Sequence, residues 1–299
     1  MKKHRTLKFF ISLGLIVLVL AGIFVGGYFI LDKAVVPKYF GKFGINNMSE
    51  LVGMMTTLYS NKDEDDIVTH GHTENDRNVA ESKLIEKGVP ALSNGRLDYN
   101  AFANGDVEVA ANSVIMLTDR ELASIINEML KTGMLADRLP NLKYINTLNM
   151  EMLELIITPE KIDGVLNKNK ADVKFTIKID TTSIRGQMAV EMGMPLFLLN
   201  MIVPKTLYLT NTVTLTNNDG EWSYVGGDIG INGKTTEKSK ILLNLLISFI
   251  FPEEDEMTTE KLQENLGEVL IKSTDMLGSI EFSDNINSTN QNGVVLTTK

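Results

Sequence analysis

The feature that most constrains this chain is an uncharged apolar run from Phe9 to Leu31. Its 23 residues, at about 1.5 Å per residue in a helix, cover a hydrocarbon core of roughly 30 Å. Four basic residues and no acidic residue precede the run: Lys2, Lys3, Arg5 and Lys8. Because basic residues stay on the cytoplasmic side, the run predicts a single-pass transmembrane helix with a cytoplasmic N-terminus and the remaining chain outside the cell.

A cleaved secretory signal peptide is the alternative interpretation of the same run. The apolar part of a signal peptide is only about 7–15 residues long, and no small-x-small cleavage motif follows Leu31. We therefore divide the chain into a cytoplasmic tail at 1–8, a transmembrane helix at 9–31, a tether with an acidic loop at 32–105 and a folded domain at 106–299. The predicted location is the cell membrane, with an extracellular C-terminal domain.

Charge and cysteine content narrow the class of protein. The chain has 29 basic and 38 acidic residues and no cysteine. Four of the basic residues lie in the predicted tail, so the outer part is acidic and does not bind nucleic acid through bulk electrostatics. Without disulfides the outer domain depends on core packing, and the absence of cysteine is more typical of a Gram-positive surface protein than of an animal ectodomain.

Two segments predict a strand followed by a helix. The first strand runs from Val107 to Leu117, and Thr118 and Glu121 have capping-box spacing for the helix after it. The second strand covers 150–157, where Thr158 can cap a short helix that has Pro159 in its first turn and extends through Leu166. Residues 33–59 predict a tether with helical stretches, interrupted by Pro37, Gly41 and Gly44.

The remaining patterns predict strands and further helices. Apolar and polar residues alternate over 171–181, as in a half-buried strand, and 207–216 and 222–231 flank an Asn-Asp-Gly turn that predicts a β-hairpin. An amphipathic helix is expected at 258–277, a short strand at 279–282 and a polar tail segment at 283–293. Together these elements predict an α+β fold with a mostly antiparallel, curved sheet packed on helices.

Acidic residues surround two histidines at 61–77, a stretch with almost no apolar residue to bury. We expect an exposed loop there. His70 and His72 could bind Zn²⁺ or another divalent ion through their imidazole nitrogens. Two histidines in an acidic loop are more often simply solvated, so no metal or other cofactor is predicted.

Motifs of nucleophilic catalysis are absent from the sequence. There is no cysteine and no G-x-S-x-G motif, and His4 in the tail is the only histidine outside the acidic loop. Carboxylate pairs for glycoside hydrolysis cannot be recognised from spacing alone, but sugar clefts usually use aromatic platforms and the chain has a single Trp222. We therefore predict a protein that is not an enzyme.

Two strongly apolar segments, at 194–203 and 241–251, are candidates for a binding surface. The chain contains 15 methionines, and Met is a flexible side chain that suits adaptable apolar pockets. An ordinary hydrophobic core is the alternative. The residues that we expect to line an apolar groove are Leu196, Phe197, Leu198, Met201, Ile202, Leu242, Leu245, Leu246 and Phe249.

Residues 117–130, which read LTDRELASIINEML directly after a predicted strand, resemble the strand and threonine-capped helix of membrane-anchored bacterial proteins of the YpmS type. Residues 203–210, VPKTLYLT, are similar in style. Those proteins resemble tubular lipid-binding (TULIP-like) folds, in which a long curved sheet wraps a helix around an apolar groove. The resemblance implies a non-enzymatic protein that shelters or transfers a lipid-like molecule, and it carries no catalytic residues.

Our leading hypothesis is thus a membrane-anchored extracytoplasmic domain that binds a lipid or other amphiphile. The alternative is a structural or partner-binding ectodomain of a cell-envelope complex, whose partners are envelope proteins.

Overall fold

The computed structural model describes residues 30–41, 44–59, 64–104, 112–132, 149–191, 193–218, 221–234, 243–244, 279–286 and 290–298. The helices in this part of the chain are η1 (Leu31–Val35, a π-helix), α2 (Val36–Phe40), α3 (Met48–Leu58), α4 (Glu64–Ile67), α5 (Glu74–Glu86), α6 (Tyr99–Asn104), α7 (Asp119–Lys131), α9 (Arg185–Glu191) and α10 (Leu196–Ile202). The strands are β1 (Val114–Thr118), β2 (Asn149–Ile162), β3 (Val165–Asp180), β4 (Thr206–Asn218), β5 (Glu221–Ile231), β6 (Ser279–Ile286) and β7 (Gln291–Thr297).

The described strands form two antiparallel sheets. The larger sheet has the order β2-β3-β4-β5, and the smaller has the order β1-β7-β6. Sheets and helices follow one another without a regular βαβ alternation, so the α+β class with antiparallel sheets is confirmed.

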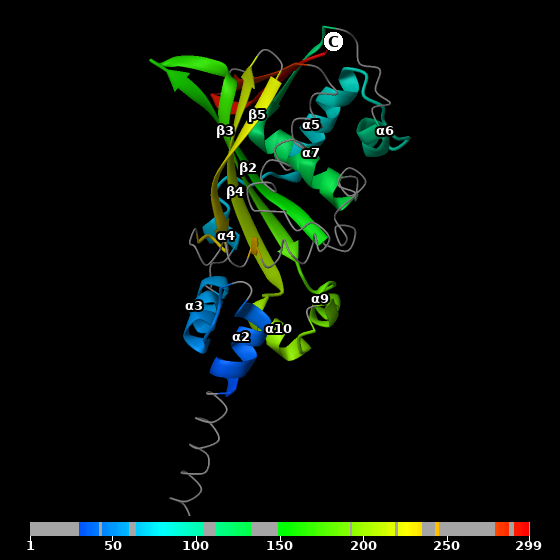
Figure 1. Ribbon diagram of the computed structural model, residues 1–299. Coiled ribbons are helices and arrows are strands. Elements are labelled where there is room, and N and C mark those ends of the chain that lie inside the picture. The colour runs from blue at the N-terminus through cyan, green and yellow to red at the C-terminus, as the bar shows by residue number, and fades with distance from the viewer. Residues whose placement is uncertain are drawn as a thin grey trace, which may run out of the picture.

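The molecule is elongated along the strands of the larger sheet (Figure 1). Helices α2, α3, α9 and α10 gather at one end, which we call the base. Helices α5 and α7, the smaller sheet and the tip of the β2–β3 hairpin lie toward the other end. The two ends have separate apolar cores.

The upper core lies between the larger sheet, the smaller sheet and the helices α5 and α7. Alternate residues of β3 supply one of its walls, because side chains two apart on a strand point to the same face. Its central members include Leu84, Leu117, Ile125, Leu155, Val173, Val213, Phe282 and Leu296. Helix α7 packs against β2, and β3 contacts β6, so both sheets share this core.

The base core consists of short helices packed on the lower ends of β4 and β5. Its buried members include Val36, Phe40, Leu51, Met54, Ile184, Met188, Leu198, Leu199, Leu207 and Ile231. Side chains of the predicted tether at 32–105 therefore contribute to this core. The sequence predicted that Pro37 interrupts a helix. It lies instead in the first turn of α2, where its missing N–H costs no helical bond.

Several local predictions are confirmed. Thr118 caps α7, and the reciprocal bonds of a capping box join it to Glu121. The half-buried strand predicted at 171–181 is part of β3, whose residues Ala171, Val173 and Ile177 are buried. The predicted hairpin of 207–231 is formed by β4 and β5.

The short helix predicted from Thr158 through Leu166 is wrong, because β2 continues to Ile162 and turns directly into β3. Pro159 pairs with Ala171, but β2 is an edge strand of the sheet, where a missing N–H removes no bond to a second neighbour. Asp163 and Gly164 form the two-residue turn, with φ of 51° and 80°, as Asp-Gly hairpins require.

The polar tail segment predicted at 283–293 is also wrong. The strand expected at 279–282 extends to Ile286 as β6, and β7 begins at Gln291. β7 pairs with both β1 and β6 and is the middle strand of the smaller sheet. Gly293 lies opposite Thr118 at the centre of this sheet, where a Cβ would be 2.1 Å from the carbonyl oxygen of Leu117.

The exposed acidic loop predicted at 61–77 is a further error. Helix α4 occupies 64–67, and α5 begins at Glu74 after a capping box made by Thr73 and Asp76. Ile67 is buried, and Gly71 forms a β-bridge with Glu154 on β2. The few apolar residues were a poor guide because this segment is bound to the sheet by polar contacts.

The predicted transmembrane segment 9–31 falls almost wholly outside the described residues, of which none belongs to a helix long and apolar enough to cross a bilayer. The helix predicted at 258–277 also lies outside them.

Candidate functional site

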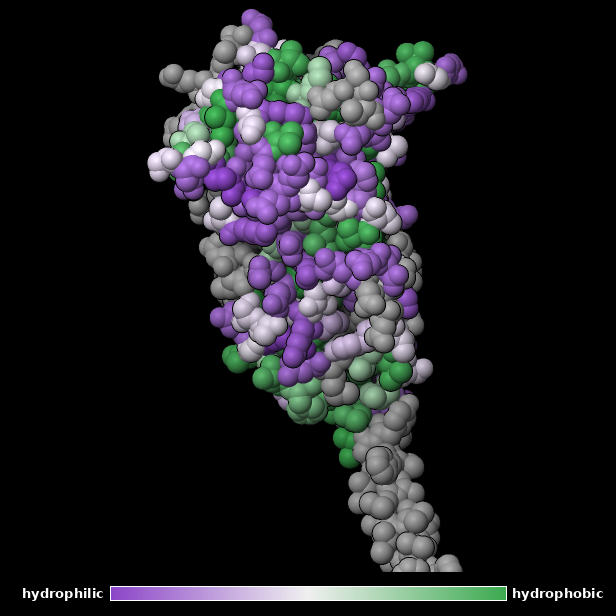
Figure 2. Space-filling view, turned by 180° about the vertical axis from the view of Figure 1, so that it is seen from behind, coloured by the Kyte–Doolittle hydropathy of each residue, from purple (hydrophilic) through white to green (hydrophobic). Residues whose placement is uncertain are grey.

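The base exposes apolar side chains on two of its short helices, α9 and α10. Val190 on α9 is 80% exposed, and Leu196 and Phe197 on α10 are 48% and 63% exposed. Single exposed apolar residues are ordinary on protein surfaces. Here three large ones lie on two helices that contact each other, and Figure 2 shows apolar surface at the same end of the molecule. This surface is the candidate site.

Helix α10 has this exposed face because all of its seven residues except Asn200 are apolar. Pro195 precedes the helix and its carbonyl accepts the backbone bonds of Leu198 and Leu199, which turn inward and are buried. A seven-residue helix with apolar residues on every side cannot bury them all against one neighbour. Leu196 and Phe197 are the residues that remain outside.

Arg185 on α9 holds the C-terminal end of α10. Its guanidinium donates to the carbonyl oxygen of Asn200, at 3.2 Å, and to that of Val203. The last carbonyls of a helix have no partner within the helix, so a donor is needed where they are buried. This contact fixes α10 to α9 although both helices are short.

Tyr59, the residue that directly follows α3, binds the same end of α10. The hydroxyl of Tyr59 donates to the carbonyl oxygen of Asn200 at 2.9 Å. Burial raises the pKa of Tyr59 against the opposing effect of Arg185, so the hydroxyl keeps its proton as donor. Helix α3 is tied in turn to η1, because Asp32 accepts the backbone N–H of Met48 at 2.6 Å.

The nine residues predicted to line a groove do not form one surface in the structure: some are exposed, one is buried, and the rest have no described side chain. Leu196 and Phe197 are on the surface of the base, and Leu198 is a member of its core. Met201 and Ile202 belong to α10, whose side chains are described only for its earlier residues. Leu242, Leu245, Leu246 and Phe249 lie outside the described residues, and Leu243, between them, is buried in the base core.

The two candidate metal ligands contact different groups of the protein. Nε2 of His70 lies 3.3 Å from a carboxylate oxygen of Asp119, and Nε2 of His72 lies 2.7 Å from the carbonyl oxygen of Met152. Burial raises the pKa of Asp119 despite the opposing effect of His70. In the part of the chain that the structure describes, no three His, Asp or Glu side chains are grouped as a metal site would require.

Glu154 explains why the histidine segment is bound to β2. Its fully buried carboxylate accepts the N–H and hydroxyl of Thr69 at 2.7 and 2.9 Å and the N–H of His70 at 2.5 Å. Lys174 lies 3.5 Å from the other oxygen. We call residues 68–73 the strap. The available sequence signal for this contact was an acidic residue, Glu154, between the apolar residues Leu153 and Leu155 of the strand.

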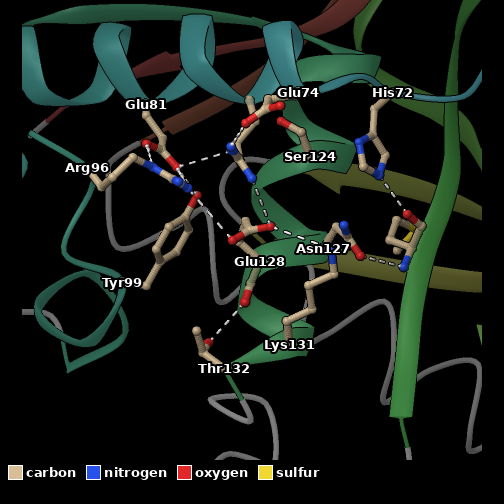
Figure 3. Close-up of polar contacts among 12 residues, drawn as sticks. His72, Glu74, Glu81, Arg96, Tyr99, Ser124, Asn127, Glu128, Lys131 and Thr132 are labelled. Atoms are coloured by element: carbon tan, nitrogen blue, oxygen red, sulfur yellow. Dashed lines mark hydrogen bonds and ion pairs between the residues drawn. The ribbon is translucent and has the colours of Figure 1, made fainter.

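A second polar network joins α5, α7 and the loop between α5 and α6 (Figure 3). The buried carboxylate of Glu81 accepts two bonds of 2.6 Å from Arg96 and one of 2.9 Å from the Tyr99 hydroxyl. Burial by itself would raise the pKa of Glu81, but the bonds from Arg96 and Tyr99 lower it. Burial and the neighbouring carboxylate raise the pKa of Tyr99. Sequence reasoning missed this network, which no local spacing marks.

The two networks bind elements of the upper part of the molecule to one another. Their carboxylates accept bonds from the protein itself, and the histidines contact the protein as well. The base differs, because it exposes the apolar side chains of Val190, Leu196 and Phe197 to solvent. Comparisons of this chain with protein-family models, with curated proteins and with solved structures found no match.

Proposed function

We propose that this protein is a membrane-anchored extracytoplasmic domain that binds a lipid or other amphiphile through the apolar surface of its base, without catalysing a reaction. The observation that carries the proposal is the exposure of Leu196 and Phe197 on α10. Helix α10 shares the base core with α2, and the described chain reaches α2 from Ile30, which belongs to the predicted transmembrane segment 9–31.

The energetics support binding by apolar contact alone. Burying a fully exposed Leu or Phe side chain contributes about 1.5–3 kcal/mol. Leu196 and Phe197 are 48% and 63% exposed, so burying the rest of each contributes roughly half of that, which is sufficient for a contact that the anchor already keeps close. No polar recognition residue is required for this contact. The lack of a chemical motif in the sequence is consistent with such a function.

Native mass spectrometry of the full chain, extracted from membranes in a mild detergent, tests the proposal. We expect a lipid-sized added mass that organic extraction removes. The variants Leu196→Asp and Phe197→Asp should carry less of it, because a carboxylate in apolar surroundings is costly. Both side chains are exposed, so these variants should fold, which circular dichroism checks.

Val165→Asp is the matched control. Val165 is 69% exposed, as accessible as Phe197, but it lies at the tip of the β2–β3 hairpin. Lipids that surround the predicted anchor should remain in all three variants. If no lipid accompanies the wild-type chain, or if the base variants and Val165→Asp retain the same amount, the proposal is wrong.

The hairpin tip favours a second function, that of a partner-binding ectodomain. Ile162 and Val165 face each other across the turn and are 58% and 69% exposed. Ion pairs tie the hairpin to β6, with Lys161 2.8 Å from Asp284 and Lys168 2.9 Å from Glu281. An envelope protein that copurifies with the wild-type chain, and is lost with Val165→Asp but not Phe197→Asp, would favour this function.

A further inference from the structure

The path of the chain limits what can cover the base. Ile30 is 60% exposed and directly precedes η1, and α2 then carries Val36 and Phe40 into the base core. The two helices have five residues each and rise by no more than roughly 15 Å. A bilayer crossed by the apolar residues before Ile30 would thus begin within roughly 15 Å of the base core, to which α9 and α10 also belong.

Charged groups around the base are occupied by contacts within the protein. Lys33 lies 3.0 Å from Asp32, and Nζ of Lys38 lies 5.0 Å from the ring centroid of Tyr39. A carboxylate oxygen of Glu50 accepts the N–H of Asn46 at 2.7 Å.

Asp180, the last residue of β3, also has partners within the protein. Hydrogen bonds from Thr182 lower the pKa of Asp180, and the nearby charges of Arg185 and Lys205 contribute. Side chains of both charge signs thus lie together at the described base, which does not present a surface of a single sign to anionic head groups.

We infer that the amphiphile covering the base is the bilayer itself, whose interfacial region receives Val190, Leu196 and Phe197 irrespective of the charge of the lipid head groups. The inference depends on the proposed function and names its ligand as ordinary bilayer phospholipid. Short apolar helices at an interface gain by burying such side chains at the boundary between head groups and acyl chains. The upper part of the domain is then held at a defined orientation to the membrane surface.

Single-cysteine labelling of the full chain tests this contact, because the protein has no cysteine of its own. An environment-sensitive fluorophore is attached at Phe197→Cys, at Val190→Cys or, as the control, at Val165→Cys. Each labelled protein is reconstituted into phosphatidylcholine vesicles with and without phosphatidylglycerol. Quenching is then measured with a nitroxide carried on the lipid and with aqueous iodide.

We expect the lipid nitroxide to quench the labels at 190 and 197 at least about threefold more strongly than the label at 165, as is expected of groups within a few ångströms of the acyl boundary. Iodide should show the reverse order. The result should be the same in both kinds of vesicle and in about 0.5 M salt, where charge attraction to lipid is screened.

Each other outcome overturns the inference. Equal iodide access at 165 and 197 would show that the base stands clear of the bilayer. Quenching that requires phosphatidylglycerol and disappears in high salt would show recognition of head-group charge. If quenching fails while the wild-type chain still carries a lipid that Phe197→Asp loses, the proposed function stands and only the bilayer contact is wrong; if both fail, both are wrong.

Discussion

The two cores of this molecule are held together by different kinds of contact. In the upper part, the buried carboxylates Glu81, Glu121 and Glu154 each accept hydrogen bonds from specific partners on other elements or within a cap. In the base, the buried charged side chain that the structure describes is Arg185, and most of the remaining contacts are apolar. Directional contacts fix geometry, whereas apolar packing is tolerant of small shifts.

Because of this difference, we expect the two ends of the molecule to differ in local stability. The upper core, with the strap and the α5–α7 network, is expected to open only when the whole domain unfolds. The base consists of short helices with exposed apolar residues, so it is expected to open at lower free energy. A surface that adapts to a lipid is better placed on such a region than on a rigid one.

The largest expected effect is that of Gly293→Ala in the smaller sheet. The added methyl group would be 2.1 Å from the carbonyl oxygen of Leu117 and 2.8 Å from Cα of Thr118, and backbone atoms of a paired strand cannot move aside. We expect a loss of about 3 kcal/mol or more in the free energy of unfolding, measured by chemical denaturation.

Gly186→Ala is the matched control in the base. No heavy atom lies within 4 Å of the position of its Cβ, and the residue is in α9. Alanine should change stability by less than about 1 kcal/mol, in the stabilising direction. Comparable losses at the two glycines would remove the distinction between the rigid and the tolerant region.

Glu81→Ala is expected to have the next largest effect. It leaves Arg96 and the buried hydroxyl of Tyr99 without their shared acceptor, which should cost about 2–4 kcal/mol of unfolding free energy. Glu81→Gln keeps the shape and should cost less. An unchanged unfolding midpoint in Glu81→Ala would contradict the view that this network secures the upper core.

Stability should also depend on pH through Glu81. Its pKa is lower in the folded protein than the ordinary value of 4.5, so the folded state binds fewer protons than the unfolded state. Its contribution is complete above pH 4.5 and is lost as the pH falls through the lowered folded pKa. The stability difference between wild type and Glu81→Gln should therefore shrink in acid, as denaturation curves at several pH values would show.

Arg185→Ala tests the base with a smaller expected effect. The carbonyl oxygens of Asn200 and Val203 lose a donor, which should cost about 1–2 kcal/mol. Hydrogen exchange should become faster in α9 and α10 but not in α7. Arg185→Lys keeps a charged donor and should be intermediate. Faster exchange throughout the domain would mean that base and upper core open as one unit.

The smallest effect on stability is expected for Phe197→Asp. The side chain is 63% exposed, so the free energy of unfolding in detergent should change by less than about 0.5 kcal/mol. Lipid association should nevertheless fall well below that of Val165→Asp. A large loss of stability would place Phe197 among the residues that hold the base together and not among those that meet lipid.

Local patterns were sufficient for the elements whose signals lie within a few residues. The capping box at Thr118 and the alternation along β3 are examples, since both depend on neighbours in sequence. The same reasoning was wrong at Thr158 and Pro159, where a helix-start signal lies on an edge strand. It missed β7, whose apolar Val294 and Leu296 are buried only because β1 and β6 lie on either side.

For the candidate site, the sequence marked α10 but not the direction of its side chains. Leu196, Phe197 and Leu198 are equally apolar, and no periodicity separates residues of a helix in which nearly every residue is apolar. Only the packing of α10 on α9 and α3 decides that Leu198 is buried and Phe197 exposed.

By itself, the sequence determined the antiparallel α+β class, the capped helix α7 and the dependence of a cysteine-free domain on packing, because these follow from composition and from contacts close along the chain. The tertiary structure alone decided that the strap binds Glu154, that Arg96 and Tyr99 meet at Glu81, and that the base turns Phe197 outward. The hydrogen bonds to Glu81 from Arg96 and to Glu154 from Thr69 join residues 15 and 85 positions apart. No local sequence pattern links residues at such separations, so only the packing of the folded chain determines which of them meet.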